Sequence, residues 1–201
     1  MRFLDCARRI CVLALAGSLT ACISIAPYVD NGMPEVPTSQ FKKTDPQHAV
    51  QVLFEFQSKG VANAKVTATL KQQVLDQVKA SGVFSNVDAA PVEGGALLSI
   101  VLNNVPITDN AAAKGFGTGL TFGLVGSEVV DGYICTATYS AGPGATPVVK
   151  TERHAIRSTI GNASAPANAT KVSSLTEAVN VMSHQVLSHV LDGVTHDPEF
   201  K

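Results

Sequence analysis

The sequence YICTATY, residues 133–139, places tyrosine, cysteine and alanine at positions that alternate with isoleucine and threonine. Because successive side chains of a β-strand point to opposite faces, this alternation predicts a strand over residues 129–141 with one buried face. AGPGATP, residues 141–147, has the composition of a turn. Residues 148–160 are predicted to return as a second strand, so residues 129–160 are expected to form a long antiparallel hairpin.

Three stretches upstream predict further strands or turns. In AVQVLFEF, residues 49–56, apolar side chains again alternate with more polar ones, which indicates a half-buried strand. ALLSIVLNNVPI, residues 96–107, is also rich in β-forming residues, and Pro106 is expected to place its end at an edge or exit of the sheet. GVFSNV, residues 82–87, predicts a short strand or a turn.

Two segments have the apolar spacing of amphipathic helices. The first covers residues 63–81, and Gly82 follows it as a stop signal. The second begins at Ser174, where Ser174 and Glu177 match a capping box that satisfies two backbone donors. Gly193 is expected to end or fray this second helix. The apolar positions are Val66, Leu70, Val74, Leu75 and Val78 in the first helix, and Leu175, Ala178, Val179, Met182, Val186, His189 and Val190 in the second.

The predicted element order is β-α-β-β-β-β-α. Each helix has one apolar stripe and must bury it against a sheet face. The sequence therefore predicts one α+β domain over residues 48–195, in which a small, mostly antiparallel sheet of four to five strands packs against two helices. Residues 22–47 contain four prolines and no apolar period, so they are expected to form an extended, Pro-rich tether of up to roughly 80 Å.

The first 21 residues have the organisation of a signal peptide. Arg2, Arg8 and Arg9 form a positive region before the apolar residues 10–19, a run too short to span a bilayer. Leu19-Thr20-Ala21-Cys22 follows directly. This motif resembles the bacterial lipobox.

The lipobox resemblance implies that cleavage occurs before Cys22 and that this cysteine carries a diacylglycerol thioether and an acylated amino group. Two or three acyl chains anchor a protein stably, whereas one gives marginal binding. Ile23 stands where an aspartate would resemble an inner-membrane retention signal, so the resemblance implies an outer-membrane lipoprotein that faces the periplasm, with the inner membrane as the alternative. An ordinary signal peptide with an incidental cysteine is the other interpretation.

Charge and cysteine content exclude some classes of function. The chain has 15 basic and 16 acidic residues; removal of residues 1–21 leaves 12 and 15, with no basic block of the kind that binds nucleic acid. No nucleic-acid partner is expected. Processing leaves Cys135 as the one cysteine not used by lipid. It is interpreted as a small buried hydrophobe, and the alternative is a reactive or intermolecular thiol.

No catalytic or metal-binding motif is recognisable, and no cofactor is expected. His184 and His189 are five residues apart, so on a helix they point roughly 140° apart and cannot jointly bind a metal. His184 falls on the polar side, and His189 falls on the apolar stripe as a satisfied core histidine. His154 lies between Arg153 and Arg157, whose charges disfavour its protonation. The chain is therefore not expected to be an enzyme.

Residues 111–130, AAAKGFGTGLTFGLVGSEVV, combine five glycines with several large apolar side chains. Three interpretations remain open: a loop or bulged hairpin that folds back on the core, an exposed apolar loop that contacts lipid or a partner protein, and a small-xxx-small helix. In the second interpretation the candidate contact residues are Phe116, Leu120, Phe122 and Leu124.

Together these features resemble small Gram-negative envelope lipoproteins. In architecture the chain is similar to the lipopolysaccharide-assembly lipoprotein family and, second, to auxiliary lipoproteins of lipid-transport ABC systems. The resemblance implies a non-enzymatic accessory or binding subunit in envelope assembly or transport, attached to the membrane through Cys22, with an outer-membrane or transport-complex protein as a possible partner. The alternatives are a stand-alone lipid- or small-ligand-binding module and a hydrolase that acts on the envelope.

Overall fold

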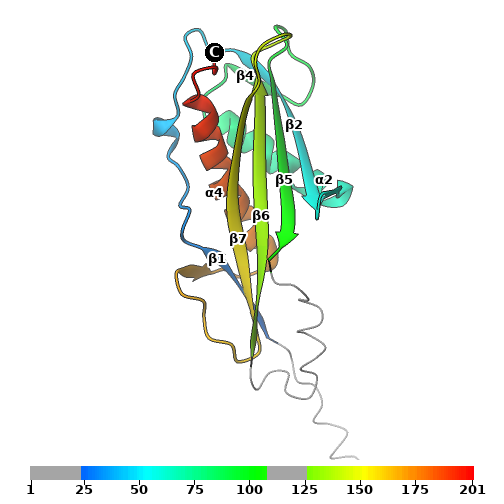
Figure 1. Ribbon diagram of the computed structural model, residues 1–201, viewed down its shortest axis with the longest axis vertical. Coiled ribbons are helices and arrows are strands. Elements are labelled where there is room, and N and C mark those ends of the chain that lie inside the picture. Colours follow the sequence, from blue (N-terminus) through cyan, green and yellow to red (C-terminus); the bar gives the residue numbers. More distant parts are fainter. Residues whose placement is uncertain (1–23, 108–125) are drawn as a thin grey trace, which may run out of the picture.

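The predicted hairpin forms the long axis of the computed structural model, which describes residues 24–107 and 126–201. β6 (Ser127–Ser140) and β7 (Val148–Ile160) pair antiparallel from Ser127↔Ile160 to Tyr139↔Val148. They lie at the centre of the sheet (Figure 1). The hairpin prediction is confirmed, and its first strand begins two residues earlier than expected.

Within the described residues the sheet has eight strands, in the order β3-β2-β5-β6-β7-β1-β8, and β4 also pairs with β2. β2 runs parallel to β5 and to β4, and the other neighbours are antiparallel. The remaining strands are β1 (Ile25–Asp30), β2 (Ala49–Ser58), β3 (Val61–Ala62), β4 (Asn86–Asp88), β5 (Leu97–Pro106) and β8 (Ala169–Lys171). The α+β class and the mostly antiparallel sheet are confirmed. The expected size of four to five strands is wrong.

The Pro-rich segment belongs to the folded domain. β1 pairs with β7 on one side and with β8 on the other, and Val29 is buried in the core. Val36 and Phe41, on either side of the short 3-10 helix η1 (Thr38–Gln40), are buried there too. The prediction of an extended tether over residues 22–47 is therefore wrong for the described part, which begins at residue 24.

Proline does not prevent pairing in β1 because of where Pro27 lies. Its carbonyl accepts a hydrogen bond from Val172 N, at 3.0 Å, just beyond the last residue of β8. In an antiparallel sheet the N–H and the C=O of one residue point to the same neighbouring strand. The N–H that Pro27 lacks would therefore point toward Val172, where β8 has stopped pairing. The proline thus interrupts no hydrogen bond that the sheet needs.

Both helices cover the same face of the sheet, where the alternating apolar residues meet (Figure 1). α2 (Ala64–Ala80) packs on β2, and α4 (Leu175–Thr195) packs on β7 and β6. The side chain of Asn63 caps α2 by accepting from Val66 N at 3.2 Å, and Gly82 follows with a φ of 62°. Both helix predictions are confirmed. No helix in residues 24–107 or 126–201 combines the length and apolarity needed to cross a membrane.

Two details at the ends of α4 differ from expectation. Ser174 Oγ accepts from Glu177 N at 3.1 Å, but the Glu177 carboxylate bonds Ser173, through its backbone N–H and its hydroxyl, and not Ser174. The helix also continues past Gly193 to Thr195. A Cβ on Gly193 would lie 3.2 Å from Lys150 Cγ, so glycine serves here to let the Lys150 side chain pass to Asp197.

Candidate functional site

One end of the sheet adjoins both regions that the sequence singles out. Ser24 and Ile25 follow Cys22 closely, and Ile25 and Ser127 both pair with Ile160. Ile107 and Gly126 are the described residues on either side of the glycine-rich stretch. The predicted lipidation residue, Cys22, and the predicted contact residues, Phe116, Leu120, Phe122 and Leu124, lie outside the described residues. We call this end, formed by residues 24–27, 126–127 and 158–168, the anchor end (Figure 1, bottom).

The backbone of the anchor end is tightly connected. Gly161 N donates to Ser24 O at 2.9 Å, which ties the first described residue to the end of β7. Gly126 has a φ of 71°, and a Cβ there would lie 2.2 Å from Ala163 N. Glycine is therefore required at this position both by the left-handed backbone and by the close approach of the 161–168 loop. This gives one glycine of the predicted anomalous stretch a packing role.

The anchor end has no ionisable side chain in residues 24–27, 126–127 and 158–168. Ile25 is 55% exposed, and Ile107, which lies nearby beside Gly132, is 64% exposed. Small and uncharged residues make up the rest. An end of this composition avoids the most expensive desolvation, that of a charged group, on approach to an apolar or interfacial environment.

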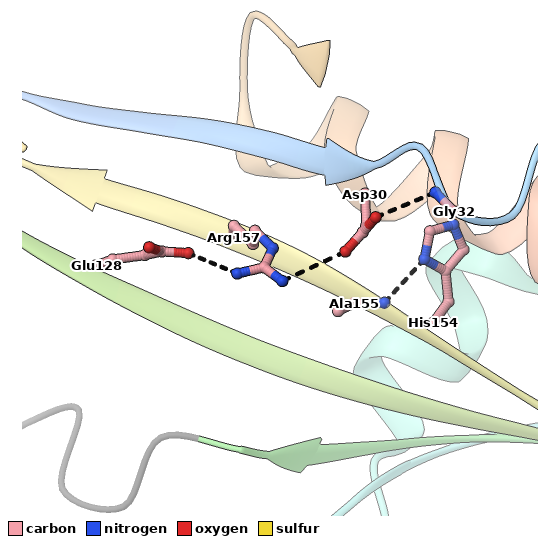
Figure 2. Close-up of polar contacts among 6 residues, drawn as sticks. All are labelled: Asp30, Gly32, Glu128, His154, Ala155 and Arg157. Atoms are coloured by element: carbon pink, nitrogen blue, oxygen red, sulfur yellow. Dashed lines mark hydrogen bonds and ion pairs between the residues drawn. The ribbon is translucent and has the colours of Figure 1, made fainter. Parts of the chain in front are cut away.

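A three-strand ion network lies next to the anchor end (Figure 2). Arg157 on β7 places Nη1 2.9 Å from Glu128 Oε1 on β6 and Nη2 3.4 Å from Asp30 Oδ2 on β1. Asp30 also accepts from Gly32 N at 3.1 Å. Hydrogen bonding to Glu128 is the largest cause that raises the pKa of Arg157, and Asp30 adds to it. The network ties three strands together and leaves one net negative charge.

A hollow of 360 Å³ lies beside this network, between Asp30, Met33, Ile107 and Arg153. His154 adjoins it but is committed to structural hydrogen bonds. Its Nδ1 accepts from Ala155 N at 2.8 Å (Figure 2), so the proton resides on Nε2, which donates to Gln185 Oε1 on α4 at 2.7 Å. Burial is the main cause that lowers the pKa of His154. The expected direction is confirmed, but the cause is desolvation and not the neighbouring arginines.

The other singled-out side chains also have structural partners. His189 is half-buried, and its Nε2 donates to Pro34 O at 2.7 Å, while His184 is 40% exposed and lies 4.0 Å from Glu35 Oε1. Cys135 is 1% exposed, and burial, with a contribution from Glu152, raises the pKa of its thiol to about 12. The prediction of a small buried hydrophobe is confirmed, and a reactive thiol is contradicted. Within the described ranges, no cluster of His, Cys, Asp and Glu is arranged to bind a metal.

Sequence reasoning missed two features because both use the segment interpreted as a tether. Asp30 completes the ion network, and residues 35–41 form one wall of a larger pocket, of 540 Å³, against α2 and α4. The available signal was the pair of apolar residues, Val36 and Phe41, between the prolines. Such isolated residues have no period from which burial can be inferred.

A scan against protein-family models finds no family that matches the chain. A search of curated protein sequences also finds no match.

Proposed function

We propose that this chain is an outer-membrane lipoprotein, acylated at Cys22, whose domain lies directly against the periplasmic surface of the bilayer. It serves there as a non-enzymatic accessory or binding subunit in envelope assembly or transport. The observation that carries the proposal is the start of β1 at Ile25, three residues after Cys22. Three residues span at most about 11 Å, so an acylated Cys22 holds the anchor end at the level of the lipid headgroups.

The composition of the anchor end supports this placement. It carries no ionisable side chain, and Ile25 offers an exposed apolar surface within reach of the headgroup region. The nearest carboxylates, Asp30 and Glu128, are both paired with Arg157. Partial neutralisation of these carboxylates reduces their repulsion from the negatively charged surface of a bilayer that contains anionic lipids.

The environments of the candidate reactive groups support an accessory or binding role over an enzymatic one. His154 uses both ring nitrogens in hydrogen bonds, one to Gln185 on α4 and one to the backbone N–H of Ala155 on β7, and the Cys135 thiol is buried with a raised pKa. A general base needs access to the proton it removes, and a thiol nucleophile needs its thiolate form. Neither condition is met by these two side chains.

Acylation at Cys22 is tested by metabolic labelling with an alkyne-bearing palmitate, using Cys22→Ala and, as a matched control, Cys135→Ala. We expect label in the wild-type chain and in Cys135→Ala, and in Cys22→Ala we expect no label and retention of the precursor mass. Label in Cys22→Ala, or its absence from the wild-type chain, refutes the anchor.

A second candidate function, a stand-alone ligand-binding module, is favoured by the 540 Å³ pocket between α2, α4 and residues 35–41. Its volume lies within the roughly 300–1,000 Å³ of small-molecule sites. If the domain still binds its ligand after release from the membrane, this result favours the stand-alone module over a membrane-apposed subunit.

A further inference from the structure

The larger pocket has an apolar floor and a polar rim. Val36, Phe41 and Leu191 form the buried apolar part, and they come from two segments that are distant in sequence. Glu35, Asp76 and His184 stand at the more exposed part of the lining. A ligand that fills this pocket must therefore combine an apolar body with a polar or charged group.

The wall formed by residues 35–41 is fixed to α4 by hydrogen bonds from Val36 and from the residues that flank it, Pro34 and Lys42. Val36 N donates to Ser188 Oγ at 2.9 Å, and Lys42 N donates to Thr195 Oγ1 at 3.3 Å. His189 Nε2 donates to Pro34 O at 2.7 Å. These bonds recur along α4, so the wall is held along its length and the pocket exists before a ligand binds. A preformed site avoids the entropic cost of ordering its wall on binding.

Two glutamines of α2 line the pocket and have amide oxygens without a hydrogen-bond donor among the described residues. Gln73 Nε2 donates to Asn180 O at 3.2 Å, and Gln77 Nε2 donates to His184 O at 2.7 Å, one turn further along each helix. Both NH₂ groups therefore point to α4, and the two amide oxygens accept no hydrogen bond within the described part of the chain. Gln77 Oε1 is in addition buried, and a small rotation of this side chain toward a donor would relieve the cost of an unpaired buried acceptor.

The charge of the lining is negative. Glu35 and Asp76 both line the pocket, and among the described residues that line it there is no lysine or arginine. The histidine in the lining, His184, is 40% exposed, and its Nδ1 lies 4.0 Å from Glu35 Oε1. Carboxylates and amide oxygens are acceptors, so they favour a ligand that supplies N–H donors and positive charge.

We propose that this pocket binds a small amphiphilic cation, in which an ammonium or guanidinium group is carried on a short apolar body. The body packs against Phe41 and Leu191, and the cationic group lies at the rim between the segment that carries Glu35 and the helix that carries Asp76. The inference does not depend on acylation of Cys22, so a failure of the anchor proposal leaves it unchanged.

The test compares 4-phenylbutylammonium with its neutral analogue 4-phenylbutan-1-ol by calorimetric titration of the full chain in lipid nanodiscs, with empty nanodiscs subtracted. We expect the ammonium to bind roughly tenfold more tightly than the alcohol, the size expected for two partly exposed carboxylates. In the double variant Glu35→Gln, Asp76→Asn, the preference should fall to about twofold or less. Both substitutions keep side-chain size at solvent-exposed positions, so the fold is retained.

Two controls locate the effect. The matched double variant Asp88→Asn, Glu93→Gln removes two exposed carboxylates outside the pocket and should keep the full preference. Ala80→Trp, at an exposed position that lines the pocket, should block both probes. Equal affinity for the two probes, an unchanged preference after Glu35→Gln and Asp76→Asn, or no ammonium binding above empty nanodiscs would overturn the proposal.

Discussion

The backbone of Ser24 is hydrogen-bonded to that of Gly161, at a distance of 2.9 Å between Ser24 O and Gly161 N. This contact fixes the position of the chain two residues after the cysteine of the lipobox-like motif. The folded domain therefore begins where a membrane anchor would end, and no long tether lies between them. A lipid at Cys22 then determines which end of the sheet faces the bilayer.

The contact of Gly126 with the 161–168 loop predicts a large cost for a side chain at this position. Gly126→Ala combines a φ of 71° with a Cβ 2.2 Å from Ala163 N, and we expect it to lower the free energy of unfolding by about 2–4 kcal/mol. Gly144 is a matched control, since its φ is 79° and nothing lies within 4 Å of its Cβ position. Gly144→Ala should cost about 1 kcal/mol. Equal urea midpoints for the two variants would show that the close contact is absent.

Removal of the Arg157 side-chain charge should destabilise the sheet in a salt-dependent way. Arg157→Gln leaves Asp30 and Glu128 without their cation, and because all three side chains are partly exposed we expect a loss of about 1 kcal/mol. The loss should shrink between 0.05 and 0.5 M NaCl, because salt screens exposed charges. Urea unfolding measures both values. Arg153→Gln, an exposed arginine on the same strand, should change stability little; a similar loss there would argue against the network.

The lowered pKa of His154 predicts a loss of stability in mild acid. Because the folded state disfavours the protonated imidazole, the unfolded chain binds more protons as the pH falls below the ordinary histidine pKa of about 6.5. The free energy of unfolding should therefore decrease from pH 7.5 to 5.5. His154→Gln retains a donor toward Gln185 and removes the titrating group, so its curve should be flatter in this range. Ser158→Ala, buried on the same strand, should shift the curve without changing its slope.

Cys135 should be inert in the folded protein. Its thiol is buried with a pKa of about 12, so reaction with a disulfide reagent at pH 8 is expected to follow global unfolding and not to precede it. Peptide mapping by mass after labelling in 0 and 8 M urea gives the site and the rate. Rapid labelling of Cys135 in the absence of urea would contradict the burial.

Much of the fold could be predicted from the sequence because long elements repeat their pattern several times. The alternation in β6 and the four-residue steps in α2 extend over enough residues to show which face is buried. β3, β4 and β8 are two or three residues long, too short for a period. β1 was not predicted because a proline argues against a strand. Pro27 is tolerated because its missing N–H lies beyond the end of β8, and only the tertiary pairing reveals this.

The candidate sites were less predictable for a related reason. Through strand pairing, Arg157 meets Asp30, which is 127 positions away in the sequence, and Glu128, which is 29 positions away, and no local pattern reports such contacts. The large pocket arises where residues 35–41 cross α2 and α4. Pairing and crossing depend on the tertiary fold, whereas the sequence pattern reports mainly which face of a single element is buried.

The most direct test of the account measures which end of the domain lies at the membrane. A fluorophore is attached at Asn162→Cys in the anchor end or at Ala145→Cys in the turn between β6 and β7, and the acylated protein is placed in vesicles with headgroup-attached nitroxide quenchers. The two sites lie at opposite ends of β7, whose 13 residues extend over roughly 40 Å. We predict strong quenching at residue 162 and little at residue 145, with loss of the difference when twenty Gly/Ser residues are inserted between Ile23 and Ser24. Equal quenching at the two sites in the uninterrupted, acylated chain would contradict direct apposition of the anchor end to the bilayer.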